Sequence, residues 1–227
     1  KATSDIHFKV EGPIIEQLQA VFDDDWLFAA GESSHLPFKK SVAKENTICR
    51  VITDGPNEDM GKLAMIITGA IALARKRVEI MTPYFLPPPE LVNSLQSAAL
   101  SGVDVCIILP QKSNQPLVHW ATRNMLWQLL QYGVRIYYQP PPFAHSKLLL
   151  VDDHYAHIGS ANIDPRSLRL NFELVVEVFN EDFVTHLHEH FDKIRANAYE
   201  ESLASVDGRW LPERIRDALA WLFSPYL

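Results

Sequence analysis

The stretch that decides the fold is residues 145–164, HSKLLLVDDHYAHIGSANID. The run 144–151 is mainly apolar and β-type, and a second strand-like run, 155–159, follows it. Asp152 and Asp153 stand between the two runs, where short polar residues are typical of a turn. We therefore expect an antiparallel hairpin in this part of the chain.

Polar side chains gather at the open ends of the predicted hairpin. Residues two apart on a strand face the same side, so His145 and Lys147 should project into one space. Ser160 and Asn162 have the same spacing at the end of the returning strand, and Gly159 permits close backbone approach there. An imidazole can attack phosphorus or protonate a leaving oxygen, while ammonium, hydroxyl and amide groups can bind phosphate oxygens. The set predicts a site for a phosphate diester.

Around this segment, strand-like and helix-like segments alternate. Strand character is found at residues 47–53, 78–82, 103–109 and 134–139, with helical patterns between them. This order is typical of an α/β layered fold, and we expect a mixed, mostly parallel sheet flanked by helices. A half-buried strand is expected at residues 5–11, where polar and apolar side chains alternate. One long helix is expected from residue 181 to about 203.

Composition excludes some classes of protein. Hydrophobic residues make up 47% and charged residues 22% of the 227 residues, as in ordinary folded domains. The net charge of -7 argues against bulk nucleic-acid binding. Two cysteines are too few for a disulfide framework and favour a reducing compartment. The longest apolar run, 63–74, is too short for a bilayer span, so we expect the chain as given to be soluble.

The motif HSKLLLVD followed by IGSANID resembles the HKD motif of the phospholipase D superfamily. Phrases such as EIMTPYFLPPPEL, GVDVCIILP, LLQYGVRIYYQ and LAWLFSPYL are similar to the C-terminal half of cardiolipin synthases in that superfamily, and the similarity covers nearly the whole chain. The resemblance implies a phospholipase D-like layered fold. It also implies phosphatidyl transfer between lipids, for example from a phosphatidylglycerol-like phospholipid, through a phosphohistidine intermediate. No cofactor and no metal are expected.

The resemblance also implies roles for single residues. The positions that match the motif are His145, Lys147, Asp152, Ser160 and Asn162. His145, Lys147 and Asp152 form the implied catalytic set, in which Asp152 orients the motif and is not a general base. Ser160 and Asn162 would bind phosphate. Glu173 is the best match for a supporting carboxylate that hydrogen-bonds the motif histidine from behind.

The family carries two such motifs, and this sequence contains one. We therefore expect residues 1–45 to be the tail of a first phospholipase D-like half plus a linker, and residues 46–227 to be the second half. The missing N-terminal half would supply the other histidine, leaving His145 as the acid/base partner and the chain alone with little activity. A dimer that pairs two copies of His145 is an alternative. The intact protein should be membrane-associated, with this domain facing the cytoplasm.

Other interpretations stay open. The chain could belong to another superfamily hydrolase, a phospholipase or a nuclease, or be a non-catalytic interaction domain. The HLHEH segment suggests a metal site, but on a helix only His186 and His190 share a face, and a solvated helix explains them better. His157 could line the pocket or pack in the sheet. Trp221 and Phe223 could touch a membrane.

Overall fold

The structure, a computed structural model, describes residues 2–34, 36–37, 42–43, 47–55 and 61–227. Its strands are β1 (Thr3–Ser4), β2 (Ile48–Asp54), β3 (Arg77–Met81), β4 (Asp104–Pro110), β5 (Arg135–Gln139), β6 (Phe143–Ala144), β7 (Leu148–Val151), β8 (Tyr155–Gly159), β9 (Glu173–Phe179) and β10 (Tyr199–Glu201). Its helices are α1 (Ile14–Ala30), α2 (Lys62–Leu73), α3 (Pro89–Leu100), α4 (Pro116–Leu130), α5 (Glu181–Arg195), α6 (Leu203–Asp207) and α7 (Leu211–Trp221), and a 3₁₀ turn spans Ser224–Tyr226. The boundary expected near residue 45 lies outside the described residues.

The strands confirm a mixed α/β fold. Among the described residues, one sheet has the order β10-β5-β4-β3-β7-β8-β9-β2, and β1 pairs with β6 apart from it. The pairings β3–β4 and β4–β5 are parallel, because a helix returns the chain to the same edge after each strand. The pairings from β3 through β7, β8 and β9 to β2 are antiparallel. Parallel pairing is thus confined to one part of the sheet.

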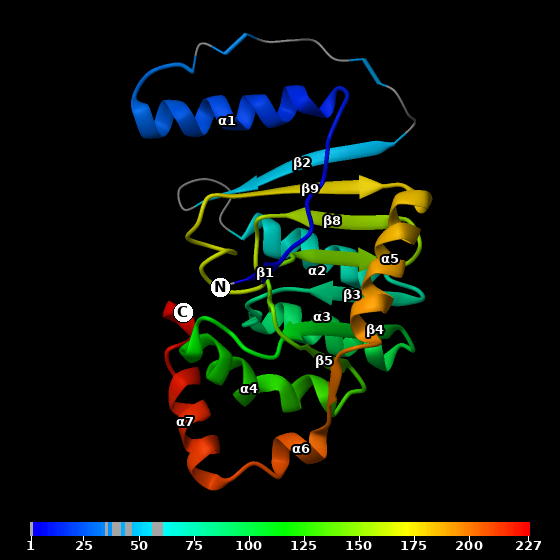
Figure 1. Cartoon of the computed structure of the whole chain (residues 1–227), viewed down its shortest axis with the longest axis vertical. Helices are drawn as coiled ribbons and strands as arrows, with labels where there is room; N and C mark the ends of the chain where they lie inside the picture. The colour runs from blue at the N-terminus through cyan, green and yellow to red at the C-terminus, as the bar shows by residue number, and fades with distance from the viewer. Residues whose placement is uncertain (1, 35, 38–41, 44–46, 56–60) are drawn as a thin grey trace.

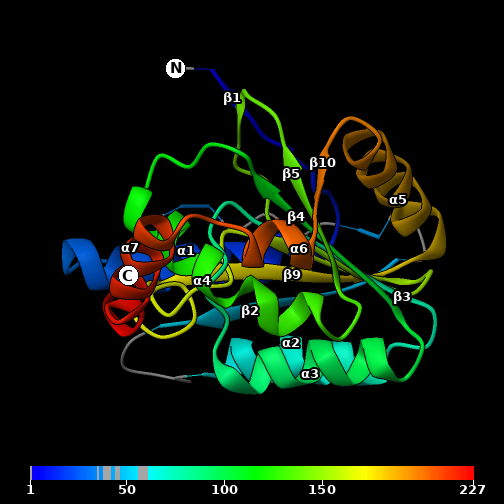
Figure 2. The ribbon, with the colours of Figure 1, turned by 90° about the horizontal axis from the view of Figure 1, so that it is seen from below.

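Helices cover both faces of the sheet (Figures 1 and 2). Helices α2 and α3 pack on one face, over a core that includes Ile67, Leu95 and Ile107. Helix α5 packs on the other face, over a core that includes Leu150 and Phe191. The central strands are buried on both faces, which explains their continuous apolar sequences. None of the described helices is both long and apolar enough to cross a bilayer.

Helix α1 lies along the outer edge of the sheet, beside β2 (Figure 1). The amide of Val51 in β2 donates a hydrogen bond to Oε1 of Gln17, at 3.1 Å. Helix α1 ends at Gly31, whose φ of 72° lies in the left-handed region that suits a helix C-cap. The helix therefore covers a strand edge that pairs with no other strand in the described part of the sheet.

The prediction of a strand at residues 5–11 was wrong. The alternating apolar side chains do pack inward, and the rings of Phe8 and Phe183 lie 5.9 Å apart. The backbone of residues 5–11 nevertheless forms no strand. The edges of the main sheet are taken by β2, next to α1, and by β10. An alternating pattern indicates that one face of a segment is buried. It does not show that the segment pairs with another strand.

The long helix expected from residue 181 to about 203 was also wrong. Helix α5 stops at Arg195, and Tyr199–Glu201 instead form β10, which pairs antiparallel with β5. Strand pairing with a distant segment overrode the local helical pattern here. The chain then starts α6 at a Ser202 N-cap, whose side chain accepts a hydrogen bond from the Ser205 amide.

A buried histidine fastens α5 to the sheet and to the hairpin. Nε2 of His188 donates to the carbonyl oxygen of Asp152 at 2.8 Å, and Nδ1 lies 2.6 Å from Oε2 of Glu79 in β3. The side chains of His188 and Glu79 are each 5% exposed. Both ring nitrogens are thus engaged in the interior, where an unpartnered polar group is costly.

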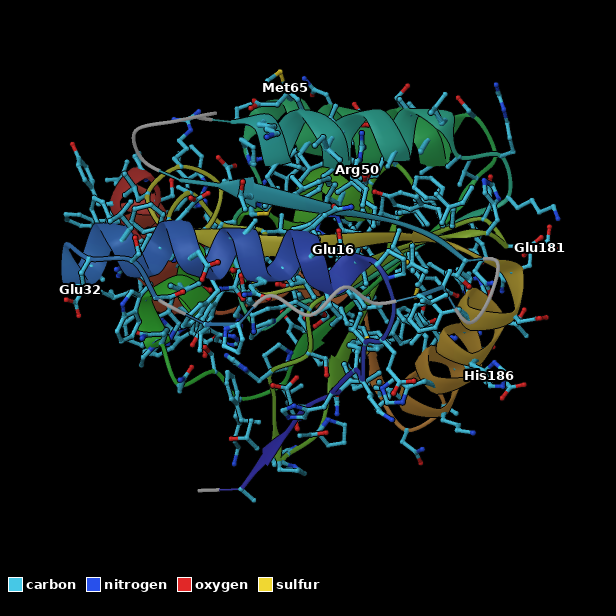
Figure 3. All side chains as sticks on the ribbon, turned by 90° about the horizontal axis from the view of Figure 1, so that it is seen from above. Glu16, Glu32, Arg50, Met65, Glu181 and His186 are labelled. Atoms are coloured by element: carbon cyan, nitrogen blue, oxygen red, sulfur yellow. The ribbon has the colours of Figure 1, made fainter. Side chains whose placement is uncertain are left out.

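Replacing His188 by Ala should lower the free energy of unfolding by about 3 kcal/mol, because it leaves the Glu79 carboxyl buried without its partner. His186 lies on the exposed side of the same helix (Figure 3) and provides a matched control. His186→Ala should change stability by about 0.5 kcal/mol or less. Urea unfolding at neutral pH measures both, and equal losses would contradict a buried anchoring role.

His157 packs inside the sheet and does not line the active-site cavity. It lies on β8 opposite Leu149 and Glu177, and its Nδ1 is buried with no hydrogen-bond partner among the described residues. Burial lowers the pKa of this imidazole from 6.5 to about 4. The neutral ring is therefore the form that the folded state keeps.

This burial predicts a pH-dependent stability. Between pH 6.5 and about 4 His157 is protonated in the unfolded chain and neutral in the folded chain. The free energy of unfolding therefore falls as pH falls through this window. The residue should contribute a loss of about 2 kcal/mol between pH 7 and pH 5. His157→Leu should flatten that part of the profile, whereas replacing the exposed His154 by Gln should not. Urea unfolding of both variants and the unaltered chain at pH 7 and pH 5 measures this, and an unchanged profile for His157→Leu would contradict the prediction.

Candidate active site

The predicted hairpin is confirmed. Strands β7 and β8 pair antiparallel, with Leu148 opposite Ile158 and Val151 opposite Tyr155. Gly159 ends β8 against β9, and a Cβ atom there would lie 2.3 Å from the carbonyl oxygen of Leu174. Only glycine fits this approach, as the sequence indicated. The open end of the hairpin therefore sits tightly against the start of β9.

A cavity of about 460 Å³ opens at this end of the hairpin. Among its lining residues are His145, Lys147 and Ser160, three of the residues that the sequence singled out. Asp5 adds a carboxylate, and most of the remaining lining side chains are apolar, such as Phe8. Imidazole, ammonium, carboxylate and hydroxyl groups thus share one space, large enough for a small ligand group.

His145 and Lys147 face one another directly. Nζ of Lys147 lies 3.3 Å from Nδ1 and 3.2 Å from Nε2 of His145, and it donates to the His145 carbonyl oxygen at 2.8 Å. Residues 145–147 lie between β6 and β7, so their backbone is not part of a strand, but the two side chains still converge. A phosphate group bound beside this ring would have the Lys147 ammonium within reach of its oxygens.

Asp5 is the carboxylate that contacts the histidine, and sequence reasoning missed it. Its Oδ2 lies 3.2 Å from Nδ1 of His145, so the ring donates from Nδ1, since an ionised carboxylate only accepts. The parallel β1–β6 pair brings Asp5 there, and the His145 amide donates to the Ser4 carbonyl oxygen at 2.8 Å. The only sequence signal was an acid in an apolar-alternating segment, with nothing to connect it to a residue so distant along the chain.

The charge of Lys147 is set by opposing effects. Partial burial lowers the pKa of its ammonium. The negative charges of Asp5, Glu173 and Asp164 act in the opposite direction. Among the described lining residues of this cavity, Lys147 is the only lysine or arginine, so its ammonium is the group that a bound anion would meet.

Glu173 does not contact the histidine, contrary to expectation. The Ser160 hydroxyl donates to Oε2 of Glu173, and the side-chain amide of Asn171 donates to Oε1 at 3.2 Å. The Ser160 oxygen also accepts from the Leu174 amide at 3.0 Å. Glu173 therefore positions the hydroxyl and acts on Lys147 at a distance, while Asp5 takes the place beside His145.

Asn162 is held by the loop that follows it. Its Nδ2 donates to the Ser167 hydroxyl at 3.2 Å, and its Oδ1 is buried with no partner among the described residues. The Ser167 amide in turn donates to Asp164 at 2.8 Å. Burial raises the pKa of Asp164, while the hydrogen bonds from Ser167 oppose the rise. Asn162 is not among the residues that line the cavity around His145.

Asp152 lies at the other end of β7 from His145, where its carboxylate orients the hairpin and does not face the cavity. Its carboxylate accepts hydrogen bonds of 2.7 to 3.1 Å from the backbone amides of residues 75, 76 and 77. Its φ of 52° is left-handed, which Asp tolerates in a tight turn. The motif carboxylate therefore ties the hairpin to β3, in line with the orienting role that the resemblance implied.

The histidines of HLHEH do not converge on a metal site. His188 is buried against Glu79, His186 is exposed, and Nδ1 of His186 contacts the carbonyl oxygen of Asp182 at 2.7 Å. Within the residues that the structure describes, no group of three or more His, Cys, Asp or Glu side chains could hold a metal ion.

Comparison with known proteins gives consistent relatives. Residues 67–195 match the model of the family described as "Cardiolipin synthase, PLD-like domain". Cardiolipin synthase 1 of Staphylococcus epidermidis is 35% identical over 98% of the chain and 46% of its own length. Cardiolipin synthase A of Pseudomonas fluorescens is 35% identical over 98% of the chain and 47% of its length. The chain thus spans about half the length of the curated relatives it matches.

Solved structures support the same fold. Phosphatidylserine synthase of Haemophilus influenzae superposes with a TM-score of 0.65 over 94% of this chain and 55% of its own, at 18% identity. Nuc of Salmonella typhimurium, a phospholipase D family member, superposes with a TM-score of 0.59 over 69% of this chain and 99% of its own, at 21% identity. At such identities the likeness concerns the fold.

The Asp5 contact predicts a fixed tautomer of His145. In the unaltered chain Nδ1 should carry the proton, because it donates to the Asp5 carboxylate. Asp5→Asn should shift the neutral ring toward the Nε2–H form, since an amide nitrogen can donate to Nδ1. Nitrogen-15 NMR of labelled histidine measures the change. Asp153→Asn, at the far turn, should leave the tautomer as it is, and an unchanged Asp5→Asn spectrum would refute the assignment.

Proposed function

The chain belongs to the cardiolipin synthase family of phospholipase D-like proteins, and from this we propose that it provides one half-site of a phosphatidyltransferase. The substrate would be a phospholipid such as phosphatidylglycerol, and the reaction would move its phosphatidyl group to the hydroxyl of a second lipid. The observation that carries the proposal is the shared cavity of His145 and Lys147, in which an imidazole and an ammonium approach within 3.2 Å.

The geometry supports a role for each group. Nδ1 of His145 is engaged by Asp5, so Nε2, which lies 3.2 Å from the Lys147 ammonium, is the nitrogen that would exchange a proton or bond with the lipid. The Lys147 ammonium would neutralise a non-bridging phosphate oxygen as charge develops. Ser160, whose hydroxyl donates to Glu173 in this structure, would turn that donor to the same phosphate. The Nδ2 amide of Asn162, which donates to Ser167 in this structure, would be its donor to a phosphate oxygen.

The transfer needs two histidines on opposite sides of phosphorus. In the first step one imidazole nitrogen bonds to phosphorus, the bond to the leaving glycerol oxygen breaks, and the other histidine protonates that oxygen. In the second step the acid/base histidine takes the proton of the acceptor hydroxyl. The acceptor oxygen then bonds to phosphorus and displaces the nucleophilic histidine. We assign His145 the acid/base role, with the nucleophile in the first half of the longer protein.

The same proposal concerns the rest of the protein. Residues 1–45 would complete a first phospholipase D-like half, and residues 46–227 would form the second. The site would work at a membrane surface with the domain on the cytoplasmic side, without a metal and without nucleic acid as a partner. Through Asp5, the first segment would contribute a carboxylate to the site of the second.

Lys147→Ala should reduce phosphatidyl transfer by about 10²–10³-fold, because it removes the charge that meets the phosphate. His145→Ala should abolish transfer. The assay supplies phosphatidylglycerol vesicles to a protein that contains this chain together with a first half-site, and it follows cardiolipin by thin-layer chromatography. His186→Ala serves as the exposed control and should keep full activity.

The chain alone should show no transfer, because one histidine is missing. Activity of the isolated monomer that disappears on His145→Ala would overturn the half-site proposal. Phosphatidic acid as the main product, in place of cardiolipin, would assign a hydrolase. Mapping of a trapped phosphohistidine tests the roles, and phosphate on His145 would reverse them.

A further inference from the structure

A second, larger cavity lies at the same end of the sheet as the candidate site. It measures about 880 Å³, far above a packing void and within the size range of ligand sites. Its walls come from α2, the start of α3, α4, residues 165–169 and the C-terminal segment. Figure 2 shows α2 and α3 together on one face of the sheet, with the C-terminus at their end.

The lining of this cavity is mainly apolar. Typical wall residues are Ala64, Leu86, Val92, Met125, Leu168 and Trp221. Among the described lining residues the charged groups are Glu90 and Arg169, which are exposed and of opposite sign, so the cavity offers no excess charge to an anion. A long apolar chain is the ligand that such walls fit.

The wall also carries a hydroxyl without a partner. Oγ1 of Thr68 is buried and forms no hydrogen bond within the described residues. A buried hydroxyl of this kind costs free energy unless it finds a partner. Because this atom is buried, the hydroxyl lies behind the apolar wall and is not presented to the cavity. Met65, also in the lining, is 69% exposed and projects outward from α2 (Figure 3), so the mouth is apolar as well.

The loop that follows Ser160 connects the phosphodiester site to this cavity along the chain. Asn162 binds Ser167, while Pro165 and Leu168, on either side of Ser167, line the cavity. The Leu86 amide donates to the Ile163 carbonyl oxygen at 2.7 Å and fixes the start of the loop to the opposite wall. A lipid whose phosphate lies at the hairpin would therefore have its tails beside this loop.

We propose that the cavity between α2, α3 and the C-terminal segment binds a fatty acyl chain of the phospholipid substrate. The proposal rests on the proposed function, because the lipid substrate identifies the apolar ligand. It adds a second subsite, which holds the tail while the hairpin holds the phosphate.

Gly69 offers a way to fill the cavity without damaging the fold. It lines the cavity, lies within α2, and a Cβ added there meets no atom within 4 Å. Gly69→Phe should therefore fold normally and occupy the space of the acyl chain. Leu73→Phe is the matched control, because Leu73 lies one turn further along the same helix, is 72% exposed and is not among the lining residues.

The binding test uses cis-parinaric acid, a fluorescent fatty acid, with the purified chain. Gly69→Phe should weaken its binding by about tenfold or more, and Leu73→Phe should leave it unchanged. Equal binding by Gly69→Phe and the unaltered chain would overturn the proposal, and so would a failure of the unaltered chain to bind.

Further variants separate this site from the catalytic one. Lys147→Ala should bind the fatty acid as the unaltered chain does, although it loses transfer. In the protein that contains both half-sites, Gly69→Phe should raise KM for long-chain phosphatidylglycerol and not for a short-chain analogue. If transfer is intact but the fatty acid does not bind, the acyl subsite fails and the proposed function stands. Self-association of the chain that Gly69→Phe abolishes would instead assign the cavity to a second copy.

Discussion

The placement of the site depends on the hydrogen bonds of one carboxylate at the hairpin turn. Asp152 accepts from the amides of residues 75–77, where the chain enters β3, and its own carbonyl oxygen accepts from His188 on α5. Two segments distant in the sequence are thereby fixed to one turn. The strands that leave the turn carry this order to the other end of the hairpin, where His145 and Ser160 lie.

The candidate site combines two kinds of strand architecture. The carboxyl ends of the parallel strands β3 to β5 lie at the end of the sheet where α/β folds commonly bind ligands. The antiparallel hairpin brings a histidine, a lysine and a serine to the same end of the sheet, where Gly159 leaves no room for a side chain. The apolar cavity beside α2 opens there too. One end of the sheet thus offers polar groups at the hairpin and an apolar hollow beside α2.

Local patterns predicted much of the fold and only part of the site. The hairpin, the alternation of strands and helices, and the convergence of His145 and Lys147 followed from residue spacing within short segments. The partner of His145 could not be predicted, because β1 and β6 bring Asp5 across most of the chain. The same limit explains Glu173, which the resemblance assigned to the histidine and which binds Ser160 instead. The end of α5 was missed because β10 gains its partner from β5, a long-range pairing.

The position of α1 along β2 bears on how the chain behaves as a solute. An edge strand with free amides is a template for association with other chains, and natural proteins shield such edges. Here the amide of Val51 is met by Gln17. Helix α1 itself exposes large apolar side chains, including Trp26 at 43% and Phe28 at 70%. The helix that shields this strand edge therefore carries exposed apolar side chains on its own outer surface.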